Sequence, residues 1–158
     1  MEYSKEKVFK KSIVWGFKTF TISQDRILLY EELVESWNKQ DIELMKSNYD
    51  IVKREIQATL EDIKTLNESN TEYCYNIIYH KSQIAMYRLN SSDISNIIQH
   101  KLNVGKLKAN KYINKMIKRK VKENLERIVE NKQWLKILKY PKEMLRVQIY
   151  EAQLDLIA

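Results

Sequence analysis

The chain has 158 residues, of which 44% are hydrophobic and 31% are charged, a composition typical of a single soluble globular domain. Two glycines and one proline leave too little material for hairpin turns or glycine-rich ligand loops, so we expect an all-α fold. The formal net charge is +7. The single cysteine, Cys74, excludes an internal disulfide framework, and we expect it to be a small buried apolar residue.

Hydrophobic periodicity predicts three helices in the first part of the chain. The first covers residues 4–20, and the second begins at Ser23 as its cap and runs through Trp37. The third covers about 41–66. The sequence NESN at 67–70 is typical of a loop, which separates this third helix from the next one.

Three further features are predicted in the middle of the chain. A tyrosine-rich helix covers 71–89 and ends in the sequence NSSD. Asp93 then caps a short helix that ends at about Leu102. The sequence Asn-Val-Gly at 103–105 predicts a turn, because glycine suits the crowded backbone between two helices.

The last part of the chain is predicted to contain a long helix over about 106–131 and a shorter one that ends near Leu156. Pro141 separates the second of these from the apolar stretch 134–140. We therefore expect one helical domain, residues 1–158, built as a compact bundle of about six to seven helices.

The positive charge is confined to one segment. No acidic residue lies between Asp93 and Glu123, whereas nine basic residues do: Lys101, Lys106, Lys108, Lys111, Lys115, Lys118, Arg119, Lys120 and Lys122. The whole chain has 28 basic and 21 acidic residues, so the rest of it is close to neutral. A polyanionic partner is the usual physical reason for tolerating such local self-repulsion.

The helical wheel of residues 106–122 separates two kinds of side chain. Six cations share an arc of about 100° on this wheel. The opposite side holds apolar residues that we expect to pack against the rest of the protein: Ala109, Tyr112, Ile113, Met116, Ile117 and Val121. The segment therefore predicts a helix with one packed face and one cationic face.

The sequence IIQHKLNVGKLKANKYINK at 97–115 resembles the helix-turn-helix of DNA-binding proteins, within residues 94–116. The resemblance rests on an apolar framework of six positions: Ile98, Leu102, Val104, Ala109, Tyr112 and Ile113. It implies that residues 93–122 form a basic helix-turn-helix, with 94–102 as the supporting helix and 106–120 as the recognition helix in the major groove of double-stranded DNA.

The resemblance also implies a role for each polar position. The residues expected to contact base edges are Lys106, Leu107, Asn110, Lys111 and Asn114. The residues expected to hold phosphates are Lys101, Lys108, Lys115, Lys118, Arg119 and Lys122. No hairpin signal follows Lys120, so a wing is not expected.

The apolar stretches of residues 132–158 are candidate dimerisation helices, since helix-turn-helix proteins commonly bind as homodimers. Completion of the monomer core explains the same residues equally well. The chain has no apolar stretch of the roughly 20 residues that a membrane span needs, and no signal-peptide core, so we expect a cytoplasmic protein, associated with the nucleoid if it binds DNA.

Enzymatic chemistry is not indicated. His80 and His100 are the only histidines and neither has a second ligand one helical turn away, so no metal site is expected. We expect no catalytic residues and no cofactor. The leading function is double-stranded DNA binding by a small regulator or a replication or partition factor. One alternative is a helical module that docks an acidic protein or RNA through the same cations, and another is a purely structural helical protein.

Overall fold

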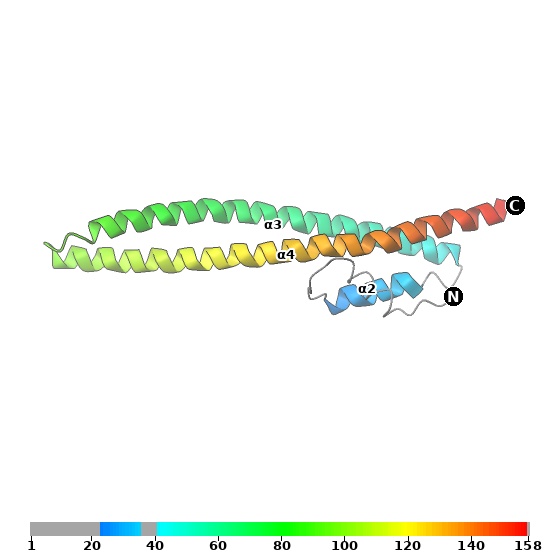
Figure 1. The fold of residues 1–158 in the computed structure, drawn as a ribbon, viewed down its shortest axis with the longest axis horizontal. Helices are drawn as coiled ribbons and strands as arrows, with labels where there is room; N and C mark the ends of the chain where they lie inside the picture. Colours follow the sequence, from blue (N-terminus) through cyan, green and yellow to red (C-terminus); the bar gives the residue numbers. More distant parts are fainter. Residues whose placement is uncertain (1–22, 36–40, 158) are drawn as a thin grey trace. The chain divides into compact units, whose positions relative to one another are not determined.

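The computed structural model describes residues 23–35 and 41–157, and these form three helices: α2 (Gln24–Glu35), α3 (Ile42–Asn90) and α4 (Ile97–Ile157) (Figure 1). The all-α class is confirmed. The predicted compact bundle of six to seven helices containing a helix-turn-helix is wrong, because the expected separators lie inside two long helices. The helix predicted over 4–20 lies outside the described residues.

The predicted loop at 67–70 is part of α3. The hydrogen bonds around this run are compatible with a helix: Thr71 Oγ1 donates to the Asn67 backbone carbonyl at 3.0 Å, one helical turn back. Asn70 is buried, and its Oδ1 accepts from Asn124 Nδ2 at 3.0 Å. The run NESN therefore contains one residue that faces another helix, and the run does not end α3.

The expected break after residue 90 is confirmed, but the cap of the next helix is a different residue. α4 begins at Ile97, and Asn96 caps it: Asn96 Oδ1 accepts from the Gln99 amide at 3.1 Å. Asp93 instead organises the turn, because its Oδ1 accepts from both the amide (3.0 Å) and the hydroxyl (2.7 Å) of Ser95.

The predicted turn at 103–105 is helical and lies within α4. Asn103 is buried, where it accepts from Gln99 Nε2 at 3.2 Å and donates to the Asn90 carbonyl at 3.4 Å. A Cβ atom added to Gly105 meets nothing within 4 Å. Pro141 is also inside α4 and is buried, so it does not separate two helices.

The described residues belong to two compact units, one formed by the chain up to Ile63 together with the chain from Val129, and the second formed by Lys64–Ile128. The first unit has an apolar core to which all three helices contribute. Its buried members are Tyr30, Leu33, Val34, Met45, Val52, Trp134, Ile137, Leu138 and Leu145. Three of the residues considered for dimerisation, Trp134, Leu138 and Leu145, are thus buried within this unit.

Polar contacts surround the indole of Trp134 in the first unit. Its Nε1 donates to Glu55 Oε1 at 3.0 Å, and the Arg26 guanidinium lies 5.3 Å from the ring centroid. Arg26 also donates to Asn131 Oδ1 at 2.7 Å, while Asn131 Nδ2 donates to Asp62 Oδ2 at 2.7 Å. These bonds join α2, α3 and α4 and fix the helices around the indole.

The second unit is an antiparallel pair made of residues 64–90 of α3 and 97–128 of α4 (Figure 1). Every third or fourth residue faces the partner helix, the 3-4 spacing of a coiled coil. The seam, as we call these buried and half-buried positions, comprises Leu66, Asn70, Tyr73, Ile77, His80, Ile84 and Tyr87 of α3 and Asn103, Leu107, Asn110, Asn114, Ile117, Val121, Asn124 and Ile128 of α4.

The seam is unusually polar. Leu66 and Ile128, at one end of the second unit, are the fully buried hydrophobic residues that the structure describes there. Five seam positions hold asparagine and one holds histidine. The prediction that Cys74 is buried is wrong, because its thiol is exposed on α3, away from the seam.

Candidate polyanion-binding surface

Residues 97–122 of α4 present three faces, each about a third of the circumference from the next at 3.6 residues per turn. The seam is the first face. The second, the cationic face, consists of Lys101, Lys108, Lys111, Lys115, Lys118, Arg119 and Lys122. The third, the apolar stripe, consists of Ile98, Leu102, Gly105, Ala109, Tyr112 and Met116.

All seven side chains of the cationic face are exposed. Lys101 and Lys122 are 21 residues apart, which corresponds to about 32 Å along a helix that rises about 1.5 Å per residue. In the part of the chain that the structure describes, none of the seven is in a salt bridge. The face is therefore a row of unneutralised charge on one continuous helix.

Two more cations lie on α3, the helix that packs against the seam. Lys81 and Arg88 are exposed on α3, in the half of the second unit that contains the turn. The carboxylates of α3 in this unit, Glu68 and Glu72, lie in the other half. α3 therefore contributes positive charge to the half of the second unit that contains the turn and negative charge to the other half.

The six residues expected to hold phosphates are all exposed members of the cationic face. Lys111, expected to contact bases, is the seventh member. Lys106 is exposed but turned toward α3, where its Nζ lies 5.5 Å from the ring centroid of Tyr87. The cationic face therefore gathers the whole phosphate set and one residue of the base-contacting set.

The remaining three residues expected to contact bases, Leu107, Asn110 and Asn114, belong to the seam. Asn110 Oδ1 is hydrogen-bonded to His80 Nδ1 at 2.8 Å, and Asn110 Nδ2 donates to the Lys106 carbonyl at 2.8 Å. Asn114 is buried, with 6% of its surface exposed. These three side chains face α3 and are not presented to a ligand outside the second unit.

The seam is not the packed face that the sequence predicted, although its spacing is visible in the sequence. Its α4 positions follow the 3-4 spacing without interruption from Asn103 to Ile128, but four of the eight are asparagines. A search for apolar periodicity alone finds the exposed apolar stripe and not the seam. Ala109, Tyr112, Ile113 and Met116, which were expected to pack, are exposed, and Ile117 and Val121 are half-buried in the seam.

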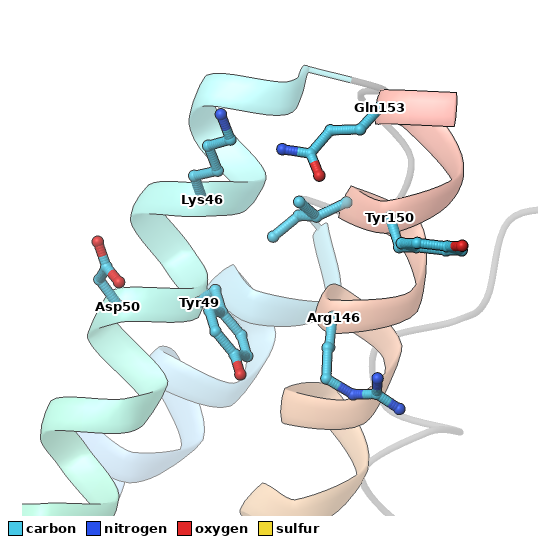
Figure 2. Close-up of a pocket in the computed structure, with 7 residues that line it drawn as sticks. Lys46, Tyr49, Asp50, Arg146, Tyr150 and Gln153 are labelled. Atoms are coloured by element: carbon cyan, nitrogen blue, oxygen red, sulfur yellow. The ribbon is translucent and has the colours of Figure 1, made fainter. Parts of the chain in front are cut away.

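The first unit has a shallow groove (Figure 2). Lys46, Tyr49 and Asp50 of α3 line one side, and α4 lines the other with Arg146, Ile149, Tyr150 and Gln153. The groove is open to solvent and holds no histidine, cysteine or serine. Its lining offers no nucleophile paired with a base, so the cationic face is the stronger candidate.

Asp93, in the turn between α3 and α4, has a shifted pKa. The pKa of Asp93 is lowered, first by the hydroxyl hydrogen bond from Ser95, then by the Ser95 amide, with a further contribution from the nearby charge of His100. These donors favour the carboxylate form. Within the described residues, no three histidine, cysteine or acidic side chains gather in the way a metal ion requires.

None of the described helices combines the length and hydropathy needed to cross a lipid bilayer. No family model, curated protein or solved structure matches the chain. The charge, exposure and contacts of the residues are therefore the features of the molecule that indicate a function.

Proposed function

We propose that this protein binds the phosphate backbone of double-stranded DNA through the cationic face of α4. The observation that carries the proposal is the row of seven exposed cations on one helix, with no acidic residue between Asp93 and Glu123. Lysine and arginine that neutralise phosphates release condensed counterions, which supplies most of the affinity of sequence-independent DNA binding.

The proposal assigns phosphate contacts and no base contacts. Leu107, Asn110 and Asn114 are suited to contact base edges, but they face α3 as part of the seam and are not available to DNA. The major groove is about 12 Å wide and accommodates a single α-helix of about 10–12 Å diameter. Because α4 is paired with α3 throughout the second unit, contacts along the backbone are favoured over insertion of α4 into the groove.

Salt dependence tests the proposal directly. We expect a labelled duplex to bind at low salt and to dissociate as the salt concentration rises from about 50 to 200 mM, measured by fluorescence anisotropy. With five to seven phosphates neutralised, the slope of log K against log salt is expected to be about −4.5 to −6.3. A flat slope, or no binding at the lowest salt, would contradict the proposal.

Charge reversal locates the contacts. The double variant Lys111→Glu/Lys118→Glu places two carboxylates in the cationic face and is expected to abolish binding at moderate salt. The matched control is Lys132→Glu/Lys139→Glu, which makes the same change in net charge at two exposed lysines of α4 in the first unit. If both double variants lost the same amount of duplex affinity, only net charge would matter, and the cationic face would be excluded as the DNA-binding site. Competition by double-stranded RNA at equal affinity would assign the face to nucleic acid backbones in general.

A further inference from the structure

The apolar stripe of α4 has the spacing of a second coiled-coil surface. Its six positions follow one another at intervals of four and three residues, the same alternation as the seam. Its large members are open to solvent: Ile98 is 75% exposed, Leu102 52%, Tyr112 66% and Met116 36%. The pattern is that of a helix that packs on two sides. In the structure α3 covers the seam, and the apolar stripe is exposed.

Gly105 lies at a central position of the stripe. The structure shows no contact within the chain that requires a glycine at this position. A glycine inside a helix costs about 1 kcal/mol relative to alanine. A Cβ at this position meets nothing within 4 Å, and its backbone is helical, so neither space nor conformation inside the chain requires glycine. Gly105 and Ala109, one turn later, are the small residues of the stripe, and small residues let another helix approach closely.

The charges beside the stripe select the partner. In a coiled coil, the positions that flank the apolar ones face the flanking positions of the second helix and set partner choice. On α4 these positions are Lys101, Lys108 and Lys115 on one side and Gln99, Lys106 and Ile113 on the other. Four of the six carry a positive charge and none carries a negative one, so a second copy of α4 meets lysine against lysine in either orientation.

We propose that the apolar stripe docks an amphipathic α-helix of another protein, with apolar residues at coiled-coil spacing and acidic residues at the flanking positions. Such a helix buries the exposed side chains of Ile98, Leu102, Tyr112 and Met116 and places its carboxylates beside Lys101, Lys108 and Lys115. This surface shares Lys101, Lys108 and Lys115 with the cationic face but does not include Lys111, Lys118 and Lys122, and the inference does not depend on duplex binding.

The test uses two designed helical peptides of about three heptads with identical apolar residues, one with glutamate and one with lysine at the flanking positions. We expect the full-length protein to bind the glutamate peptide at least about tenfold more tightly than the lysine peptide by fluorescence anisotropy. Equal affinity for the two peptides, or no binding of either, would overturn the proposal.

Variants of the chain identify the surface. Leu102→Gln and Tyr112→Gln remove apolar contact at exposed positions, so the fold is retained while affinity for the glutamate peptide is expected to fall about tenfold. Ile78→Gln is the matched control, since Ile78 is 64% exposed on α3, outside the stripe. The double variant Lys101→Glu/Lys108→Glu is expected to reverse the preference toward the lysine peptide. If the double variant still preferred the glutamate peptide, or if Ile78→Gln lost as much affinity for that peptide as the stripe variants, the stripe would be excluded as the docking site.

Sedimentation velocity tests whether a second copy of this chain, and not another protein, occupies the apolar stripe. We expect the protein without peptide to show no association that depends on the stripe, because the flanking lysines repel one another. A dimer that Leu102→Gln dissociates would assign the stripe to a second copy of the chain and overturn the proposal. Duplex binding by Leu102→Gln is expected to equal that of the unmodified protein, so failure of this inference and failure of the proposed function are distinguishable.

Discussion

Asn114 illustrates what a polar seam costs at a single position. Its Oδ1 is buried and has no hydrogen-bond partner among the described residues. A buried acceptor without a partner typically costs about 1–3 kcal/mol. We expect Asn114→Leu to raise the free energy of unfolding by about 1–2 kcal/mol in urea denaturation, because leucine removes the unsatisfied oxygen and adds apolar burial.

Asn70 provides the control for that substitution. Its Oδ1 accepts from Asn124 Nδ2, so Asn70→Leu leaves the half-buried Asn124 amide without its partner. We expect this variant to lower the free energy of unfolding by about 1–2 kcal/mol. Stabilisation of both variants would mean that the asparagine pair contributes nothing, and destabilisation of both would mean that Asn114 has an essential partner.

Asp93 provides a second prediction at the residue scale. Its pKa is lowered chiefly by the Ser95 hydroxyl, so Ser95→Ala is expected to raise the pKa of Asp93 toward its ordinary value, as measured by NMR titration. A carboxyl whose folded pKa is depressed favours folding above the unfolded pKa, and this contribution is lost as the pH falls through the folded pKa. Acidification is thus expected to loosen the turn between α3 and α4, and an unchanged pKa in Ser95→Ala would contradict the assignment.

At the scale of the element, Gly105 distinguishes a continuous helix from a turn. Because residues 103–105 are helical and a Cβ at 105 meets nothing within 4 Å, Gly105→Ala is expected to stabilise the protein by about 0.8–1 kcal/mol in thermal or urea unfolding. Ala109→Gly, at an exposed position of the same helix, is expected to destabilise it by a similar amount. Destabilisation by Gly105→Ala would indicate a turn with positive φ at this position.

The ends of α3 and α4 were only partly predictable from the sequence. Low glycine and proline content predicted the all-α class correctly, and the break after residue 90 was found from its serines and Asp93. The predicted breaks at 67–70 and 103–105 were wrong because asparagine is common both in turns and in this polar seam. Asn70 and Asn103 hydrogen-bond to residues of the facing helix segment or the turn end, 54 and 13 positions away in sequence, which local patterns do not reveal.

The candidate site was predictable to the same limited extent. The cationic residues could be placed on one face because helical spacing alone determines which lysines share a side, and all six of the predicted phosphate contacts are exposed. The orientation of that face relative to the packed side could not be found. Leu107, Asn110 and Asn114 were assigned outward because the apolar stripe was expected to be the packed face, and the structure instead packs the helix through a polar one.

At the scale of the whole molecule, the two units differ in what holds them together. The first has nine buried core residues, whereas in the second the fully buried hydrophobic residues that the structure describes are Leu66 and Ile128. Local stability follows buried apolar contact, so we expect backbone amides of residues 45–56 to exchange hydrogen more slowly than those of residues 73–87. Equal protection of these two parts of α3 would show that the polar seam is as stabilising as the apolar core.

Duplex binding is expected to change that profile in one place. Addition of duplex DNA at low salt should slow exchange in residues 101–122 and leave α2 unchanged, as measured by mass spectrometry. Protection confined to α2 or to the groove in the first unit would place the DNA elsewhere on the chain.

The exposure of Cys74 has a practical consequence for all of these measurements. It is the only thiol in the chain, it faces solvent, and it lies on α3 in the same unit as the cationic face. A maleimide dye can therefore be attached at one defined position of the unmodified sequence, with no cysteine to remove and none to introduce. Energy transfer from that dye to an acceptor on a duplex or on a helical peptide then reports each binding event separately, and on the same labelled protein.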